Sequence, residues 1–222
     1  IEITLPPSYI TITNVVVAPA QPVTDSSTEV RADLNTFAGA SIDQAHTFYR
    51  TRSGDSFSAI TMSSTGGATY ETDDSGIPAQ NIAGTSVEYY LRVISSGVGG
   101  TKTNYFPSTA PQDVLRYRVD AISAYADMEI GGSVSTNMIL VDDNLWQGVI
   151  IPPATISNPS FNFAATNLTW GDNAPESTGL PVFGDAATGE SNIPVSGSIS
   201  NVLSFLFNDT APHDYSIQRS EY

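Results

Sequence analysis

The sequence contains no cysteine and few positively charged residues. Without cysteine, the 222-residue chain can form neither a disulfide framework nor a thiolate metal site. Its eight Lys and Arg residues stand against 23 Asp and Glu residues, which gives a net charge of −15 at pH 7. Because such a chain repels phosphate groups, the charge argues against nucleic acid or an anionic lipid surface as the partner.

Long apolar runs and helical patterns are also scarce. No stretch approaches the roughly 20 apolar residues of a membrane helix, so we expect no membrane insertion. No signal peptide is recognisable, although a mature secreted chain would have lost it. Lysine occurs once, at Lys102, and Ser, Thr, Asn and Gly are abundant. This composition favours a secreted or cell-surface location.

Short alternating strands fill the sequence instead. The stretch TEVRADL, for example, places Val30, Ala32 and Leu34 on one face and charged residues on the other. Turns with glycine separate the strands, and the composition becomes more acidic after residue 119. We therefore predict an all-β protein with two tandem β-sandwich domains, residues 10–119 and residues 120–222.

The segment before the first domain has a pattern of its own. In IEITL, the side chains of Ile1, Ile3 and Leu5 share one face of a strand. Pro6 and Pro7 follow, and neither can donate to a strand ladder, so this strand cannot form a hairpin with the next one. We predict that residues 1–9 are an N-terminal strand and a Pro-Pro tether, and that the strand docks on a sheet edge elsewhere.

Residues 15–119 resemble a known kind of module. The stretches FYRTRSGDSFSAITM, GIPAQ and VEYYLRV occur in the order found in immunoglobulin-like and fibronectin-III-like modules of secreted multidomain bacterial proteins. The resemblance implies a sandwich that serves as a spacer or a binding platform. After residue 120, the stretches NMILVDDNLWQGVII, FNFAATNLTWGDN and NVLSFLFNDTAPHDYSIQR are similar to a starch-binding type of carbohydrate module.

The second resemblance suggests a glycan site, with one departure from the pattern. Such modules carry a sugar-stacking aromatic just after their first strand, whereas this chain has MEIGGSVSTNM there, without any aromatic residue. The remaining candidates for stacking on a sugar are Trp170, Tyr125 and Tyr215, because Trp170 stands at a turn. We expect Trp146 in the core, within a strand (WQGVII) whose two faces are both largely apolar and therefore both covered.

The sequence offers no constellation of catalytic residues. His46 and His213 lie in different predicted domains, and the carboxylates lie in turns, where Asp is favoured for turn geometry alone. We therefore expect no enzyme activity, no transition-metal site and no cofactor. Calcium remains an open alternative, because several turns hold neighbouring oxygen ligands. These are Asp73 with Asp74, Asp142 with Asp143, and Asn208 with Asp209 and Asp214.

The leading strand favours assembly as the function. A glycan module has no need of residues 1–5, whereas a donated strand requires an apolar alternation, a tether and a free sheet edge. We therefore predict a non-catalytic extracellular subunit that polymerises head-to-tail with other copies of itself. The alternative is a glycan-binding accessory module of a secreted or cell-surface protein.

The charge is divided unevenly between the two predicted domains. Residues 1–119 hold 11 acidic and seven basic residues, a net charge of −4, whereas residues 120–222 hold 12 acidic residues and one basic residue, a net charge of −11. The arginines of the first domain either face the acidic domain of a neighbouring copy or are simply the outward residues of their strands. They are Arg31, Arg50, Arg52, Arg92, Arg116 and Arg118.

Overall fold

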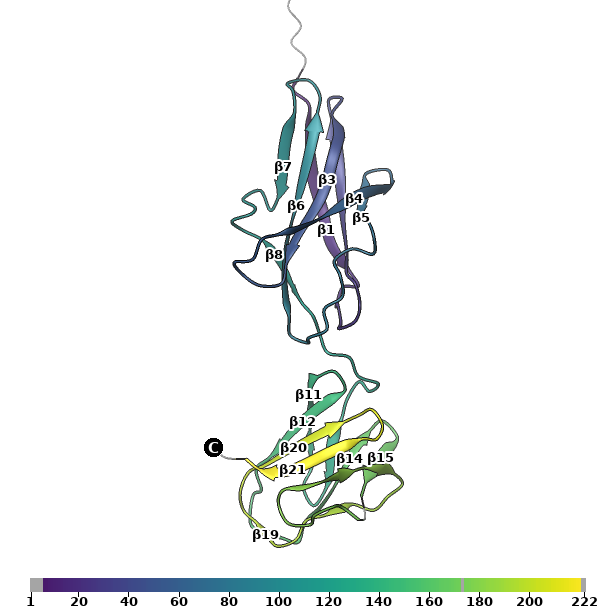
Figure 1. The fold of residues 1–222 in the computed structure, drawn as a ribbon, viewed down its shortest axis with the longest axis vertical. Coiled ribbons are helices and arrows are strands. Elements are labelled where there is room, and N and C mark those ends of the chain that lie inside the picture. Colours follow the sequence, from purple (N-terminus) through teal and green to yellow (C-terminus); the bar gives the residue numbers. More distant parts are fainter. Residues whose placement is uncertain (1–5, 173, 221–222) are drawn as a thin grey trace, which may run out of the picture. The chain divides into compact units, whose positions relative to one another are not determined.

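The chain is an all-β protein of antiparallel sheets, as the sequence predicts. The computed structural model describes residues 6–172 and 174–220 and contains no helix there. It divides into two compact units, unit 1 (Ile1–Asp120) and unit 2 (Ala121–Tyr222) (Figure 1). No helix of the described chain is long and apolar enough to cross a membrane.

Unit 1 forms one eight-stranded sheet system. The strand order is β1-β2-β5-β4-β3-β6-β7, and β8 pairs with β6 beyond the end of β7. The strands are β1 (Tyr9–Ala18), β2 (Glu29–Phe37), β3 (Ser41–Arg50), β4 (Ser58–Gly66), β5 (Thr69–Thr72), β6 (Ser86–Ser96), β7 (Lys102–Phe106) and β8 (Leu115–Arg118).

Strand β4 connects the two layers of unit 1. Its first half, Ser58–Thr61, pairs with β3, and its second half, Met62–Gly66, pairs with β5. Through β4, the layer that contains β1, β2 and β5 is therefore continuous with the layer that contains β3, β6 and β7. The two ends of the strand order are β1 and β7.

The core of unit 1 follows the alternation of the sequence. Val30, Ala32 and Leu34 are buried, as predicted, while their neighbours on β2 point outward. Because successive side chains of a strand lie on opposite faces, this pattern fixes which face of β2 meets the core. Strand β6 supplies the buried Val87, Leu91 and Val93 from the opposite layer. The core is thus mainly aliphatic.

Unit 2 contains two larger sheets and a short two-stranded one. One sheet has the order β10-β9-β14-β15-β17, with β18 on β14, and the other has the order β11-β12-β20-β21-β16. The strands are β9 (Glu129–Gly132), β10 (Thr136–Asn137), β11 (Ile139–Asp142), β12 (Leu145–Ile150), β13 (Ile156–Ser157), β14 (Ser160–Ala165), β15 (Leu168–Gly171), β16 (Val182–Asp185), β17 (Ala187–Thr188), β18 (Ile193–Pro194), β19 (Ser198–Ile199), β20 (Leu203–Asn208) and β21 (Asp214–Arg219).

Aromatic rings fill the space between the two larger sheets of unit 2. Phe161 on β14 meets Phe205 on β20 edge to face, with ring centroids 5.0 Å apart. Phe163 stacks on Phe207 at 4.5 Å in the same layer. Such pairs add to the stabilisation that burial of the rings already provides. This core explains why FNFAA and LSFLFN both show alternating phenylalanines.

Candidate functional site

The predicted docking strand, Ile1, Ile3 and Leu5, lies outside the described residues. The description begins at Pro6, so the point at which the chain joins unit 1 is the first structural information on this feature. That point is Ser8, which is buried although its neighbours Pro7 and Tyr9 are exposed. A buried polar residue between two exposed ones indicates a specific attachment.

Four hydrogen bonds hold Ser8. Its backbone N–H donates to the carbonyl oxygen of Val98 at 2.8 Å, and its Oγ donates to the carbonyl oxygen of Ala38 at 2.6 Å. Its Oγ also accepts from the N–H of Val98, and its carbonyl oxygen accepts from Lys102 Nζ at 2.7 Å. Gly97 makes this approach possible, because a Cβ there would lie 2.5 Å from Ser8 Cβ. Whatever precedes Ser8 therefore leaves unit 1 at a fixed point.

The aromatic residues proposed for sugar stacking do not form an exposed platform. Trp170 is 1% exposed and Tyr215 is 4% exposed, so the prediction that they present their rings to solvent is wrong. Tyr125 is half-buried, and its ring meets that of Trp170 edge to face at 5.2 Å. The three rings belong to the core of unit 2 or pack directly against it.

Trp170 is buried because residues distant in sequence cover it. Phe207 and His213 lie against its ring at centroid distances of 5.5 and 5.8 Å. Gly171 brings the chain close to Ser191, since a Cβ at Gly171 would lie 2.0 Å from the carbonyl oxygen of Ser191. The turn that suggested exposure is thus itself covered by another loop.

Tyr215 is bound to an acidic residue. Its hydroxyl group donates to Asp172 Oδ2 at 2.9 Å. Burial, and then this hydrogen bond, raise the pKa of the tyrosine above its ordinary value of 10.0. The polar residues after Trp170, which a sugar-binding turn would use, are Asp172 and Asn173. Asp172 is engaged within the protein, and Asn173 lies outside the described residues.

Trp146 lies in the core, which confirms the prediction, and it is 4% exposed. Its indole Nε1–H donates to Asp209 Oδ2 at 2.8 Å, and Ser123 Oγ donates to the same oxygen. The prediction that both faces of this strand are covered is wrong, because Val149 is 40% exposed and Ile151 is 75% exposed on the other face. Asp209 thus connects the start of unit 2 to its core.

Three of the turn residues named as calcium ligands accept hydrogen bonds from groups of the protein. Asp73 Oδ2 accepts from Ser63 Oγ at 3.0 Å, and Asp142 Oδ1 accepts from the N–H of Asp143 at 2.9 Å. Asn208 Oδ1 accepts from Thr210, in the geometry of an Asx turn. Within residues 6–172 and 174–220, no group of three or more His, Cys, Asp or Glu side chains is placed to hold a metal ion.

The two histidines belong to different units and have different surroundings. His46 lies on β3, where burial and then the positive charge of Arg92 lower its pKa from 6.5. His213 lies in unit 2, with its ring parallel to that of Phe207 at a centroid distance of 6.0 Å. In the described chain, the Nδ1 atoms of both histidines are buried without a hydrogen-bond partner.

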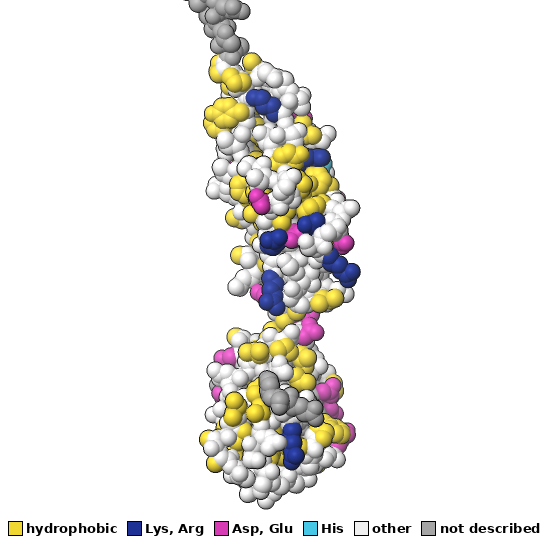
Figure 2. Space-filling model, turned by 90° about the vertical axis from the view of Figure 1, so that its left-hand side faces the viewer, with side chains coloured by type: hydrophobic (Ala, Val, Ile, Leu, Met, Phe, Trp, Pro, Cys, Tyr) yellow, Lys and Arg dark blue, Asp and Glu magenta, His cyan; other side chains and the backbone are white. Residues whose placement is uncertain are grey.

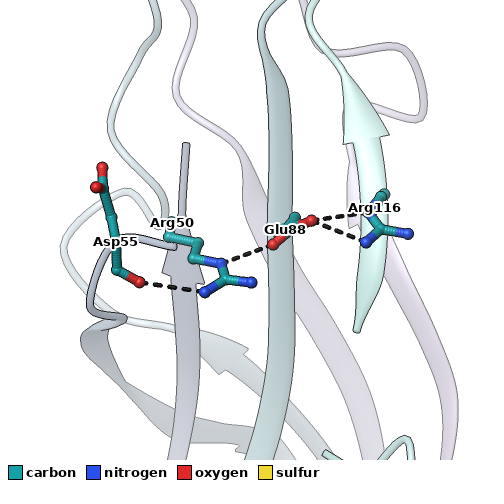
Figure 3. Close-up of polar contacts among 4 residues, drawn as sticks. All are labelled: Arg50, Asp55, Glu88 and Arg116. Carbon is teal, nitrogen blue, oxygen red and sulfur yellow. Dashed lines mark hydrogen bonds and ion pairs between the residues drawn. The ribbon is translucent and has the colours of Figure 1, made fainter. Parts of the chain in front are cut away.

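A charge network that the sequence analysis did not single out lies on the outer face of unit 1. Glu88 on β6 binds Arg50 from β3 on one side, with Nε to Oε2 at 2.6 Å, and Arg116 from β8 on the other, at 2.8 Å (Figure 3). Arg50 also donates to the carbonyl oxygen of Asp55 at 3.2 Å. The hydrogen bonds from Arg116 and then Arg50 lower the pKa of Glu88 below 4.5.

Aromatic rings and arginines form a layer beside this network. Phe48 stacks on Tyr90 at 5.0 Å, and Phe57 meets Tyr90 edge to face at 4.9 Å. The guanidinium group of Arg50 lies 4.4 Å from the centre of the Phe57 ring, and that of Arg92 lies 4.6 Å from the centre of Phe48. These cation–π contacts use the arginines locally and stabilise the outer face of the sheet.

The charges on the surface follow the division seen in the sequence. Lys and Arg side chains gather mainly on unit 1 in the face shown in Figure 2, and the magenta Asp and Glu side chains lie on both units. Arg31 pairs with Glu29 and Glu71, at 2.9 and 3.0 Å. Several of the arginines considered for contacts with a neighbouring copy are therefore bound within unit 1.

No protein family matches the chain, and no curated protein is recognisably similar to it. The candidate site therefore depends on the geometry alone. Its defined parts are the attachment of the chain at Ser8 and the sheet edges of the two units.

Proposed function

We propose that the chain is a non-catalytic structural subunit of an extracellular filament, and that residues 1–5 of one copy dock on the next copy. The observation that carries the proposal is the attachment of Ser8 to Ala38, Val98 and Lys102. This attachment gives the preceding segment a fixed starting point on unit 1. A fixed starting point is what a donated strand needs to transmit a defined spacing to its neighbour.

The residues between this segment and Ser8 support docking on another molecule. Pro6 and Pro7 are both exposed and have no backbone N–H, and they favour an extended spacer over a tight turn. A strand with one apolar face, Ile1, Ile3 and Leu5, is costly to leave in water. Burial on a neighbour removes this cost.

Such a contact is heterologous, because the donated strand and the edge that receives it are different surfaces. Heterologous contacts produce open chains unless the rotation between copies closes a ring. The internal ion pairs of Arg31, Arg50 and Arg116 favour strand docking over a charge contact as the main source of affinity. We therefore expect the assembly rate to change little as salt is raised, since apolar burial is not screened.

Matched substitutions within the leading segment test the proposal. Ile3→Asp places a charge on its apolar face, whereas Thr4→Asp places the same charge on its polar face. We expect light scattering and electron microscopy to show polymers for the wild type and Thr4→Asp, and none for Ile3→Asp or for a chain without residues 1–7. Equal assembly of all four, or a wild type that stays monomeric at every concentration, would contradict the proposal.

A further inference from the structure

One side of unit 1 is left open by its strand order. Hydrogen-bonded pairs connect β1 through β2, β5, β4, β3 and β6 to β7. In the described chain, β1 pairs only with β2, and β7 pairs only with β6, so each has one unpaired edge. Strand β1 begins directly after Ser8, and β7 begins at Lys102, whose Nζ binds the carbonyl oxygen of Ser8. The two strands run in the same direction, because an even number of antiparallel pairings connects them.

A groove lies between these two end strands. Its volume is about 510 Å³, and it is lined by Ile10–Ile12 of β1, by Thr103–Phe106 of β7 and by Ser108. We call it the β1–β7 groove. Ile10 is buried in it, and Ile12 and Phe106 are half-buried and pack against the core of unit 1. Exposed Thr11, Thr103 and Tyr105 form its outer rim.

We propose that the β1–β7 groove of one copy receives residues 1–5 of another copy, which then pair as a strand with β1, β7 or both. This inference rests on the proposed function and names the edge that function requires. Strand addition to free edges supplies main-chain hydrogen bonds, and the alternate side chains supply apolar contacts.

The dimensions and the pattern of the two partners match. The alternation visible in Ile1–Leu5 spans five residues, and β7, Lys102–Phe106, also has five residues. At about 3.3 Å per residue, each extends roughly 17 Å. When Ile1, Ile3 and Leu5 face the half-buried Ile12 and Phe106, Glu2 and Thr4 face solvent beside the threonine rim. Both faces of the donated strand then have suitable surroundings.

The geometry at Ser8 argues against self-docking. Strand β1 begins at Tyr9, immediately after the fixed residue Ser8. For residues 1–5 to enter the groove of their own unit, the chain would have to reverse direction within Pro6–Ser8. Tight hairpin turns need residues with φ > 0 at their centre, which the proline ring forbids. The groove is therefore free for the segment of another copy.

Three other edge strands fit this segment less well. In unit 2, the edge strands β10 and β17 have two residues each. The edge strand β16 ends at Asp185, close to the charges of Asp172 and Glu176, and would repel Glu2 of the donated strand. Residues 120–222 carry a net charge of −11 from 12 acidic residues and one basic residue, whereas β7 begins with Lys102.

The absence of cysteine makes disulfide trapping a direct test. A disulfide forms only when two Cα atoms approach within about 7 Å, so it reports contact between specific residues. One chain carries Thr4→Cys, and a second chain carries either Thr11→Cys or Thr103→Cys on the rim of the groove. Matched control chains carry Thr61→Cys on β4, Val141→Cys on β11 or Phe183→Cys on β16, all of which are exposed positions.

After mild oxidation of equimolar mixtures, we expect a covalent dimer on a non-reducing gel for the two rim positions and its loss for the three controls. Polymers that cross-link only through Val141→Cys or Phe183→Cys would overturn the groove and leave the proposed function intact. Polymers whose Thr4→Cys cross-links to none of the five positions would also overturn the groove. A wild type without polymers would overturn both proposals.

A single chain that carries both Thr4→Cys and Thr103→Cys tests self-docking. At low concentration we expect no internal cross-link, because the groove is reached only by another copy. A fast-migrating monomer that forms under these conditions would show self-docking and overturn the inference. Far-UV circular dichroism and the unfolding midpoint, unchanged from the wild type, establish that each variant is folded.

Discussion

Units 1 and 2 are both built from short antiparallel strands, but they place their aromatic rings differently. In unit 1 the core is mainly aliphatic, and Phe48, Phe57 and Tyr90 form an outer layer with arginines. In unit 2 the rings are inside, where Phe163 and Trp170 are almost completely buried. The comparison shows that the same strand-rich composition supports two kinds of stabilisation.

The two units also differ in the surroundings of their charged carboxylates. Glu88 of unit 1 is held between two arginines, so its negative charge is compensated. In unit 2, Asp185 on β16 lies opposite Asp214 on β21, and the charges of the two carboxyl groups repel each other when both are ionised. Ionisation of Glu88 thus stabilises unit 1, whereas ionisation of both Asp185 and Asp214 destabilises unit 2.

The largest expected effect is on the aromatic core of unit 2. Phe163→Ala removes a fully buried ring and its stack on Phe207. Such a truncation costs about 3–5 kcal/mol of the free energy of unfolding. Both tryptophans, Trp146 and Trp170, lie in unit 2, so urea unfolding followed by tryptophan fluorescence reports this unit alone.

The matched control for this prediction is Phe183→Ala, which removes a ring that is 42% exposed on β16. We expect its free energy of unfolding to change by no more than about 0.5 kcal/mol, the usual range for surface substitutions. Equal losses for the two variants would show that the buried rings do not dominate the stability of unit 2.

A smaller effect is expected where the core of unit 2 depends on a buried charge. Asp209→Ala leaves the indole N–H of Trp146 without its partner and releases Ser123. Hydrogen bonds to charged groups contribute about 1.5–3 kcal/mol, and we expect a loss of this size in the fluorescence transition. Ser123→Ala, which removes one of the two bonds, should cost less. If it costs as much, the bond to Trp146 contributes nothing measurable.

The strand pattern could be predicted from the sequence because it depends on neighbouring residues. Val30, Ala32 and Leu34 alternate with charged residues, and this period of two determines the buried face. The all-β class follows from many such segments. The burial of Trp146 follows from the largely apolar face that it shares with Ile150, which local sequence reveals, whereas the exposure of Val149 on the other face does not.

The features that could not be predicted depend on residues far apart in the sequence. Trp170 stands before Gly171 and Asp172, a pattern typical of an exposed turn, but Tyr125, Phe207 and His213 cover its ring. The pairing of Glu88 with Arg50 and Arg116 likewise depends on which strands become neighbours. The open side between β1 and β7 is a property of the strand order, which no local pattern reveals.

The compensated charge of unit 1 gives the next prediction. Glu88→Gln removes the charge between Arg50 and Arg116, and we expect a loss of about 1 kcal/mol at pH 7. Because the folded-state pKa of Glu88 is lowered, its contribution is present above pH 4.5 and is lost as the pH falls through that lowered value. The substitution should therefore flatten the acid side of the stability profile.

The measurement for Glu88 uses far-UV circular dichroism, in which unit 1 appears as the transition that tryptophan fluorescence does not report. Arg52→Gln serves as the control and should leave the acid profile unchanged, because it also changes one charge and Arg52 forms no ion pair within the described chain. Identical profiles for the wild type and Glu88→Gln would refute the contribution of the network.

The smallest effect, and the one of opposite sign, is expected at Asp185. Its hydrogen bond with Asp214, and then burial and the nearby charges of Asp214, Glu176 and Asp172, raise its pKa above 3.8. A raised folded-state pKa means that the stabilising protonated form is lost as the pH rises through that value. Asp185→Asn keeps a hydrogen-bond donor for Asp214 without the charge, so it should raise the fluorescence midpoint of unit 2 at pH 7. The gain should shrink as the pH falls and as salt screens the repulsion.

Asp127→Asn removes a charge that does not act on Asp185 and should give a smaller gain with less dependence on pH. If the two variants behave alike, the effect comes from the net charge of unit 2 and not from the Asp185–Asp214 pair.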